Sequence, residues 1–415
     1  MNINLDFSNC SNNLLKSNNN IKKKIFINRN SKEFNKVIFA LFLAGFATFS
    51  ILYCVQPILP IFSKKFNLSP VESSLSLSAS TFMMSIGMLF SGSLSDTFGR
   101  KLIMGISLVS SSVLTMLSSG IESWIGIIIM RSLIGLSLSG VVGVAMSYLN
   151  EEINPKMLGV SMGLYISGNT VGGLAGRMIS SIVTHYFSWK IAFFSVGCCS
   201  FLASLLFILF LPSSKNFSSI KITPISIFNN MLRQWNDKSL SVLFIIGFIL
   251  MGSFITIFNY ITYRLMNNPF NLNQIIISCI SLVYLIGVYT SPTAGVLTTK
   301  YKSKFILISA LLAMIFGILL TQVNTIIFII AGLIFFSGGF FAAHSVASSW
   351  IGYLAKQAKG QASSLYLFFY YLGSSICSII GGCCWLLGHW IGISIFVSIM
   401  LFLGIRLINK LNHNF

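Results

Sequence analysis

Twelve apolar stretches, each long enough to cross a lipid bilayer as a helix, constrain this chain more than any other feature of its sequence. Crossing the hydrocarbon takes about 20 mostly apolar residues, and only a helix or a closed barrel leaves no backbone amide unpaired there. The chain is 55% apolar and 8% charged, so its polar side chains could not cover the surface of a soluble domain. We therefore predict an all-α membrane protein. The stretches run approximately over residues 37–62, 70–94, 101–120, 124–149, 157–183, 188–211, 239–263, 272–297, 305–321, 325–352, 360–383 and 388–408.

The sequence also repeats itself, and the two copies divide the twelve stretches into two sets of six. The segments FNLSPVESS (66–74) and GSLSDTFGRK (92–101) have later counterparts in FNLNQIIIS (270–278) and GVLTTKYKSK (295–304). Duplicated membrane proteins of this kind commonly rock one half against the other around a central site. The predicted organisation is a basic, disordered cytoplasmic tail over residues 1–35, a six-helix bundle over 36–211, a cytoplasmic linker over 212–238, a second six-helix bundle over 239–408 and a cytoplasmic tail over 409–415.

Basic residues indicate which side of the membrane each loop faces, because loops rich in lysine and arginine are retained in the cytoplasm. With both termini inside, 21 of the 27 basic residues lie in cytoplasmic segments and two lie within helices, which leaves only Lys64, Lys65, Lys190 and Arg264 outside. The net charge of +19 is therefore a retention signal, aided by attraction to anionic membrane lipids, and it does not indicate a nucleic-acid partner.

The residue types needed for catalysis or metal binding are sparse. The eight cysteines form no CxxC pair, the four histidines are scattered, and no glycine-rich phosphate loop is followed by lysine. We predict that the chain is not an enzyme and that it holds neither a metal nor a cofactor.

One loop carries the most specific motif. GSLSDTFGRK resembles the loop between helices 2 and 3 of the major facilitator superfamily, with Thr97 where that family usually has a basic residue. The resemblance implies that Asp96 accepts hydrogen bonds from the start of helix 11, near Gly360, in one conformation only, and so acts as a latch. A carboxylate is favoured at a helix N-terminus; the alternative is an aspartate that only caps its own loop. The matching residues are Gly92, Asp96, Gly99, Arg100 and Lys101.

Helix 4 is expected to carry an arginine within the membrane. RSLIGLSLSG (131–140) is similar to the helix 4 pattern of the same family at Arg131 and Gly135, although Ile134 stands where glutamine is often found. A guanidinium inside the membrane is costly and usually functional, but the side chain could instead extend to the outer interface. Both interpretations of Arg131 are open at this point.

Helix 5 is dense in glycine. GLYISGNTVGGLAG (163–176) resembles the motif that marks antiporters in the superfamily, with Asn169 in place of its proline, so antiport is one of two open interpretations. Glycines this dense form a smooth groove against which another helix can move. The matching glycines are Gly168, Gly172 and Gly173.

Residues 36–408 as a whole resemble the bacterial inner-membrane efflux branch of the superfamily, often labelled arabinose-efflux permeases. The runs FFAAHSVASSW (340–350) and LYLFFYYLGSS (365–375) strengthen the resemblance to its YnfM-like members. The resemblance implies the major-facilitator fold, with twelve transmembrane helices in two pseudo-symmetric six-helix bundles. It also implies a monomeric secondary transporter in the bacterial inner membrane that moves a small solute, in the direction of efflux, by alternating access. The alternative is a non-transporting scaffold or receptor derived from a transporter fold.

The coupling ion and the solute are left open by the polar residues. No acidic residue lies deep in a predicted helix, so proton antiport would have to use His344, which can titrate near physiological pH. A neutral, hydrogen-bonded histidine is the alternative. The candidate cavity offers amide and phenol groups, with Arg131 and, as a second candidate, Arg177 as its only charges, which favours a neutral or anionic solute over a cation. Tyrosines can equally pack or lie at the membrane interface. The candidate cavity residues are Tyr53, Gln56, Tyr165, Asn259, Tyr284, Tyr366 and Tyr370.

Two helix boundaries are also marked in the sequence. Ser69, Pro70 and Glu72 form a capping box with proline at the first helical position, which predicts the start of helix 2. Pro57 and Pro60 predict a broken or 3₁₀ end of helix 1, because proline lacks the backbone N–H that a helix needs.

Overall fold

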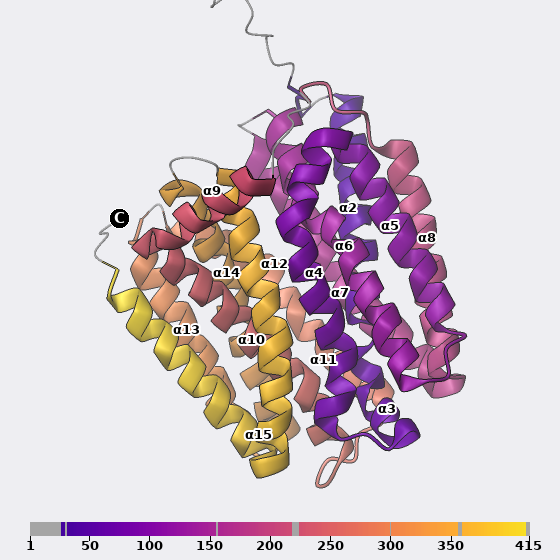
Figure 1. Ribbon diagram of the computed structural model, residues 1–415. Coiled ribbons are helices and arrows are strands. Elements are labelled where there is room, and N and C mark those ends of the chain that lie inside the picture. The colour runs from indigo at the N-terminus through magenta and orange to yellow at the C-terminus, as the bar shows by residue number, and fades with distance from the viewer. Residues whose placement is uncertain are drawn as a thin grey trace, which may run out of the picture.

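The computed structural model consists almost entirely of helices (Figure 1) and describes residues 26–29, 31–154, 157–217, 224–298, 300–355 and 359–411. The helical elements are α2 (Lys32–Tyr53), η1 (Gln56–Ile58), α3 (Leu59–Phe66), α4 (Pro70–Phe98), α5 (Arg100–Ser118), α6 (Trp124–Glu152), α7 (Leu158–Tyr186), α8 (Trp189–Phe210), α9 (Pro224–Asn236), α10 (Lys238–Met266), α11 (Gln274–Ile280), η3 (Ser281–Leu285), α12 (Ile286–Leu297), α13 (Ser303–Leu320), α14 (Ile326–Leu354) and α15 (Lys359–Asn409). Nine helical runs in these ranges are long and apolar enough to cross a membrane.

The remaining predicted spans are present as the second part of α15, as the continuous helix α7 and as a run of three short helical pieces. Helix α15 is two helices that meet at Gly388 and His389, whose backbone angles are not helical. Helix α7 has 29 residues. The run α11–η3–α12 crosses in three pieces, whereas the sequence predicted one continuous helix over 272–297. The all-α architecture with twelve spans is therefore confirmed.

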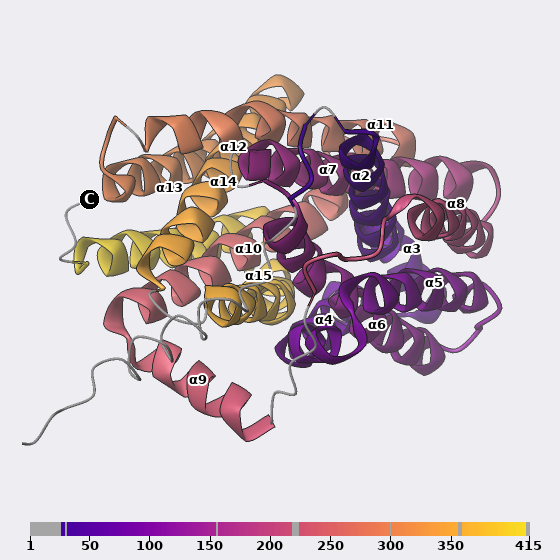
Figure 2. The same ribbon diagram turned by 90° about the horizontal axis from the view of Figure 1, so that it is seen from above.

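The helices form two bundles of consecutive elements, α2 to α8 from the first half of the chain and α10 to α15 from the second (Figure 1, Figure 2). In the first half α4 and α5 pack on α6, and α2 packs on α7 and α8. In the second half α10 packs on α15, and α14 packs on α12 and α13. The two halves meet where α4 lies along α15 and where α7 contacts α11 and η3.

Both marked helix boundaries are confirmed. The Glu72 carboxylate accepts a hydrogen bond from the Ser69 backbone N–H at 2.8 Å, and the Ser69 hydroxyl accepts one from the Glu72 N–H at 3.3 Å, which completes the capping box. Helix α2 ends at Tyr53, and the chain continues as the 3₁₀ turn η1 before α3 begins at Leu59. Pro57 and Pro60 each lie at the first or second position of their new helix, where a missing N–H costs nothing.

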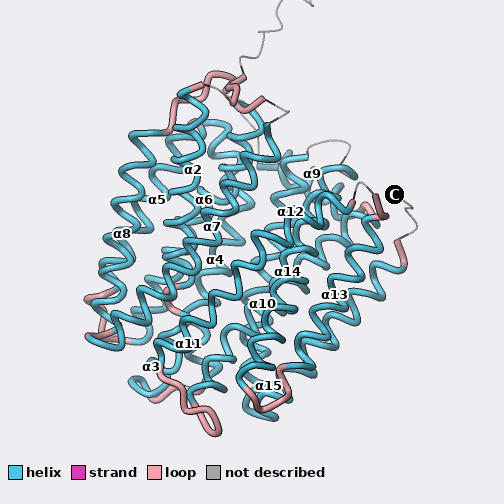
Figure 3. The backbone as a smooth tube through the Cα atoms, turned by 180° about the vertical axis from the view of Figure 1, so that it is seen from behind, coloured by secondary structure: helices cyan, strands magenta, loops and turns pink. Residues whose placement is uncertain are grey.

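The two ends of the molecule hold different parts of the chain, and we name them the terminal end and the far end. The terminal end holds α9 and the first and last described residues (Figure 1, Figure 3). There Ile27 N donates to Glu152 O at 2.8 Å, and Lys304 Nζ donates to Asn409 O at 2.9 Å. The far end holds α3, the start of α4 and the loop between α10 and α11.

The predicted tails and linker are described only in part. Helix α9 occupies residues 224–236 of the predicted linker, and residues 218–223 lie outside the described residues. Residues 1–25 and 30 of the predicted N-terminal tail and residues 412–415 of the C-terminal tail also lie outside them. The assignment of the terminal end to the cytoplasm stays a prediction from the basic residues.

Candidate functional site

Hydrogen bonds join the two halves of the molecule toward the far end. The Tyr263 hydroxyl of α10 lies 2.6 Å from the Ser73 hydroxyl of α4 and 2.9 Å from the Ser63 hydroxyl of α3. Deeper in the interface, the Ser375 hydroxyl of α15 donates to the Ser78 carbonyl of α4 at 2.9 Å. These contacts use side chains that can separate without breaking a helix, so they suit an interface that opens and closes.

A chain of four polar residues crosses between the halves at the broken end of helix 1. Arg177 Nε donates to Gln56 Oε1 at 2.6 Å, and Gln56 Nε2 donates to Asn259 Oδ1 at 2.6 Å. Asn259 Nδ2 then donates to Ser378 Oγ at 2.7 Å. All four residues are buried. We name Arg177, Gln56, Asn259 and Ser378 the polar bridge; it connects α7 and η1 of the first half to α10 and α15 of the second.

Aromatic rings hold the guanidinium of Arg177 on two sides. Its Cζ lies 4.3 Å from the ring centre of Tyr53 in the first half and 4.5 Å from that of Tyr284 in the second. A cation over the face of an aromatic ring is attracted by the electrons of the ring, and the attraction is strongest where water is excluded. Arg177 therefore interacts with both halves at once.

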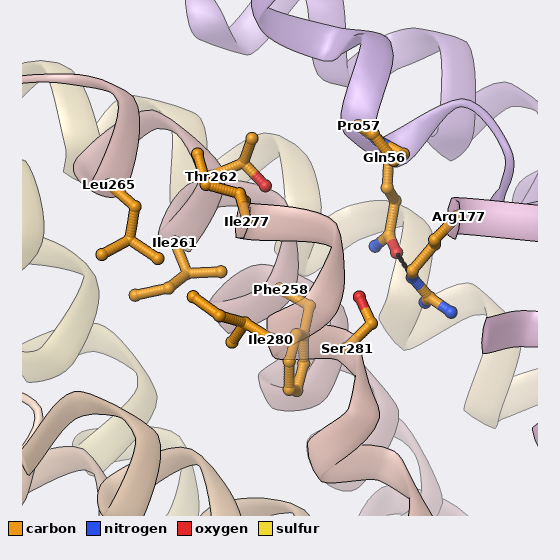
Figure 4. A pocket seen from close by; sticks show the side chains of 10 residues that line it. All are labelled: Gln56, Pro57, Arg177, Phe258, Ile261, Thr262, Leu265, Ile277, Ile280 and Ser281. Atoms are coloured by element: carbon orange, nitrogen blue, oxygen red, sulfur yellow. Dashed lines mark hydrogen bonds between the residues drawn. The ribbon is translucent and has the colours of Figure 1, made fainter. Parts of the chain in front are cut away.

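A small cavity of about 20 Å³ lies beside the polar bridge (Figure 4). Gln56 and Arg177 line it from the first half, and Phe258 and Ile280 are among the residues that line it from the second. A space of this size holds roughly one water molecule. The far end is thus closed around the bridge in this conformation.

The predicted cavity residues fall into three places. Tyr53, Gln56, Asn259 and Tyr284 meet at the polar bridge. Tyr366 and Tyr370 lie in the second half, beside His344. Tyr165 is buried in a separate apolar cluster of the first half and does not join either group. The sequence offered Arg177 only as a second candidate charge of the cavity, after Arg131, and not in the list of cavity residues. Its signal was a charged side chain in an apolar helix with no acidic residue at helical spacing.

His344 lies in an aromatic surrounding. Its Nδ1 is 2.8 Å from the Tyr366 hydroxyl, and its ring centre is 4.7 Å from that of Tyr370. The ring of Phe340, one helical turn earlier on α14, is nearly parallel to it at 6.1 Å. This geometry fits the hydrogen-bonded histidine that the sequence left as one alternative.

Arg131 donates hydrogen bonds to the last turn of α2, where the predicted helix 1 breaks. Its side chain is 1% exposed and donates to three backbone carbonyls, those of Ser76 at 3.0 Å, Ile51 at 3.0 Å and Leu52 at 2.7 Å. The last carbonyls of a helix have no partner within that helix, and Ile51 and Leu52 belong to the last turn of α2. Arg131 therefore does not extend to the membrane interface; it satisfies the carbonyls that the break exposes.

The glycines of the predicted helix 4 and helix 5 motifs, which lie on α6 and α7, permit close helix contacts. A Cβ atom on Gly135 of α6 would lie 2.0 Å from the Ser80 carbonyl oxygen of α4. On α7, a Cβ on Gly168 would lie 2.4 Å from Phe42 O, and one on Gly172 would lie 2.3 Å from Phe46 O, both on α2. The glycine groove of the predicted helix 5, which is α7, thus packs on α2, the predicted helix 1 of the same half.

The other two helix 5 positions face different neighbours. A Cβ on Gly173 would lie 3.2 Å from Arg177 Nη1, so this glycine leaves room for the guanidinium. Asn169 faces Gly45 of α2, whose added Cβ would lie 2.3 Å from Asn169 Oδ1. The asparagine that replaces the motif's proline therefore contacts helix 1 as the neighbouring glycines do.

The loop motif between α4 and α5 forms an ion-paired turn. Gly99 has φ of +100°, which only glycine adopts readily. Arg100 Nη2 lies 2.5 Å from Asp96 Oδ1 and 2.6 Å from Glu151 Oε1 of α6. Gly92 lies within α4, and no atom lies within 4 Å of a Cβ added to it. Arg100 and Lys101 form the first turn of α5.

The predicted contact of Asp96 with helix 11 stays a prediction. In this conformation the Asp96 carboxylate pairs with Arg100 of its own half. The residues just before α15, 356–358, lie outside the described residues, as do the surroundings of Gly360.

Comparison with known proteins agrees with this architecture. The sequence profile described as Major Facilitator Superfamily matches residues 41–378. The chain is 50% identical over 387 residues to the inner membrane transport protein YnfM of Escherichia coli (strain K12), covering 93% of each chain. It is 56% identical over 398 residues to an uncharacterized transporter of Buchnera aphidicola subsp. Acyrthosiphon pisum, covering 96% of this chain and 97% of the relative.

Two solved structures have the same fold at low sequence identity. A bacterial homologue of the human lysosomal transporter Spinster has a TM-score of 0.69 at 15% identity, covering 92% of this chain and 99% of that one. The nucleoside transporter NupG has a TM-score of 0.69 at 12% identity, covering 89% and 99%. The family of the chain follows from the profile and from the sequence relatives, and the structures agree with its fold. The chain belongs to the major facilitator superfamily and is a multi-pass membrane transporter, not an enzyme.

Proposed function

We propose that this transporter exports a small solute across the inner membrane of a bacterial cell by alternating access, as a monomer, with the far end as its outer gate. The polar bridge carries the proposal, because its four residues join the two halves on the far-end side of their interface and would separate if the halves rocked apart there. The basic residues support the orientation, since they cluster in segments that the terminal end would hold.

The energies of the inter-half contacts suit a reversible gate. A hydrogen bond contributes about 0.5–1.5 kcal/mol net. Four hydrogen bonds cross the interface, at Gln56, Ser63, Ser73 and Ser375, and together they contribute about 2–6 kcal/mol to the closed far end. A solute with a modest preference for one state can shift such an equilibrium.

Proton antiport is the coupling that the side chains favour. Among the described residues His344 is the histidine that contacts a phenol inside the bundle, and its Nδ1 shares a hydrogen bond of 2.8 Å with the Tyr366 hydroxyl. His344 lies on α14 and Tyr366 lies on α15, the helix of the second half that packs against α4 of the first half. Proton binding at His344 could thus respond to the position of the second half.

Transport by the purified protein tests the proposed function. The protein is reconstituted into liposomes and offered a panel of small neutral and anionic solutes, with and without an imposed pH gradient, beside protein-free liposomes. Saturable flux that follows the pH gradient is expected. Flux that ignores the gradient would remove proton antiport, and a complete absence of flux with a folded protein would favour the scaffold or receptor alternative.

Asp96→Asn is expected to lower the transport rate roughly 5- to 10-fold, the scale of one allosteric coupling, while leaving the folded protein intact. The reason is the proposed latch, in which the carboxylate binds the start of helix 11 in one conformation. The measurement is solute flux together with the melting temperature in detergent. Glu151→Gln is the matched control, because Glu151 also pairs with Arg100 but is not part of the motif. An equal loss in both variants would identify the Arg100 ion pair, and not a latch, as the cause.

A further inference from the structure

Arg177 has hydrogen-bonding capacity that no described residue uses. Its Nε donates to Gln56 and its Nη1 donates to Gly173 O at 2.6 Å, but its Nη2 has no hydrogen-bond partner among the described residues, although the side chain is only 3% exposed. A buried, unused donor on a charged group costs free energy unless a ligand or water meets it. The same atom lies at the boundary of the two halves.

Arg131, another arginine buried within the first half, shows that the unpaired Nη2 of Arg177 is not a general feature of buried arginines in this protein. Both arginines lie within the first-half bundle and are almost fully buried. All three guanidinium nitrogens of Arg131 donate to backbone carbonyls, so its role is structural. Arg177 leaves one nitrogen unpaired, and that side chain lines the cavity between the halves.

No carboxylate among the described residues neutralises Arg177. The seven described acidic residues each have another partner near a helix end. Glu33 pairs with Lys215, Glu72 with Ser69, Asp96 and Glu151 with Arg100, Glu122 with Lys190, Glu152 with the Asn216 N–H, and Asp237 with the Ser239 N–H. The rings of Tyr53 and Tyr284 offset part of the cost of the buried charge, but a ring cannot accept the in-plane N–H of Nη2 as an anion does.

The walls of the cavity indicate the rest of the ligand. Figure 4 shows Gln56 and Arg177 on one side and Phe258, Ile280 and Ser281 on the other. One cationic donor opposite apolar and aromatic side chains matches a small molecule with one anionic group and an apolar body. The cavity holds about 20 Å³ in the closed conformation, so such a solute would enter only when the halves separate.

We infer that the solute of this transporter is a small organic anion, a carboxylate with an apolar body, whose charge binds Arg177 between Tyr53 and Tyr284. This inference rests on the proposed transport function and specifies its substrate class. Binding would place the anion against Nη2 and leave the bonds of Arg177 to Gln56 and Gly173 in place. The anion thus supplies the counter-charge that the bundle itself does not supply at this position.

The test compares carboxylates with their amides, which have the same shape and no charge. Acetate, benzoate and phenylacetate are titrated beside acetamide, benzamide and phenylacetamide against the purified full-length protein, and the shift in melting temperature gives the affinity, because a ligand that binds the folded state stabilises it. At least one carboxylate is expected to bind roughly 10- to 100-fold tighter than its amide, the effect of one charge-assisted hydrogen bond.

Three variants separate binding from folding. Arg177→Gln is expected to abolish the preference for the carboxylate, whereas Arg177→Lys, which keeps the charge, is expected to retain part of it. Arg264→Gln is the matched control, since Arg264 is another buried arginine but donates to Thr321 O and Asn324 at the far end. It is expected to leave the preference unchanged.

The outcomes distinguish this inference from the proposed function. Equal binding of carboxylate and amide, no response to any carboxylate, or an undiminished preference in Arg177→Gln would each overturn the anion site. Flux of an uncharged solute in liposomes would leave transport standing while contradicting the substrate class. A folded protein that binds carboxylates at Arg177 but moves none of them would keep the site and contradict the transport function.

Discussion

Replacing Gly172 by leucine is expected to remove most of the folded protein from the membrane. A Cβ at this position would lie 2.3 Å from Phe46 O and 2.5 Å from Phe46 Cα. Both are backbone atoms of α2, so no side-chain rotation can relieve the clash. Added bulk in a packed core typically costs about 1–3 kcal/mol, and here the two helices must separate along their whole contact. The measurements are the yield of detergent-extracted monodisperse protein and its melting temperature.

Gly163→Leu is the matched control for that substitution. Gly163 lies on the same helix, α7, and no atom lies within 4 Å of a Cβ added there. The two variants have the same change in composition and helix propensity, so they differ only in what the new side chain meets. We expect the control to be extracted at close to the wild-type yield. A Gly172→Leu protein as stable as Gly163→Leu would contradict the close packing of α7 on α2.

A disulfide between Ser78→Cys and Ser375→Cys is expected to abolish transport, and a reductant is expected to restore it. The Ser375 hydroxyl donates to the Ser78 carbonyl at 2.9 Å across the interface of α4 and α15, which brings the two positions near the separation that a disulfide bridges. The bond would hold the far end closed and so prevent one of the two conformations. Flux is measured in a background whose eight native cysteines are replaced by alanine, before and after oxidation.

A second disulfide within one half provides the control. The hydroxyls of Ser112 on α5 and Ser204 on α8 lie 3.3 Å apart, and both helices belong to the first half. Oxidised Ser112→Cys/Ser204→Cys protein is expected to transport at the rate of its reduced form, because each half moves as a unit in the proposed alternating-access cycle. Flux that survives complete cross-linking of the 78–375 pair would show that the interface need not open.

Much of the fold was predictable because it depends on local composition and spacing. The twelve spans follow from hydrophobic length, the start of α4 from Ser69 and Glu72, and the break after α2 from two prolines. The 3₁₀ segment η3 was not predicted, because its sequence contains no proline or glycine to mark it. It packs on α7 and α14, so its conformation depends on contacts with distant parts of the chain.

The site was less predictable because its contacts join distant parts of the chain. Tyr53, Gln56, Asn259 and Tyr284 stood out as polar side chains in apolar helices, and they do meet. The different roles of Arg131 and Arg177 could not be read from the sequence, since both are single arginines in a glycine-rich helix. What separates them is the set of carbonyls each can reach, which depends on where α2 breaks and on how α4 and α7 pack against it. Likewise, the spacing of the helix 5 glycines predicted a close contact but not that its partner is α2.

The central claim is that the two halves rock, so that one end of the molecule opens as the other closes. Distances between pairs of spin labels, measured by double electron–electron resonance, test it most directly. One pair joins Asn67 and Asn268 at the far end, and the other joins Asn150 and Lys302 at the terminal end; all four side chains are exposed. The labelled protein is measured in lipid nanodiscs from pH 5.5 to pH 8 and with the carboxylate and amide panel.

We expect each pair to give two distance populations that change in opposite directions. Any condition that raises the long-distance population at the far end should raise the short-distance population at the terminal end by a similar fraction. Single, unchanging distances at both ends in a protein that still transports solute would contradict the account.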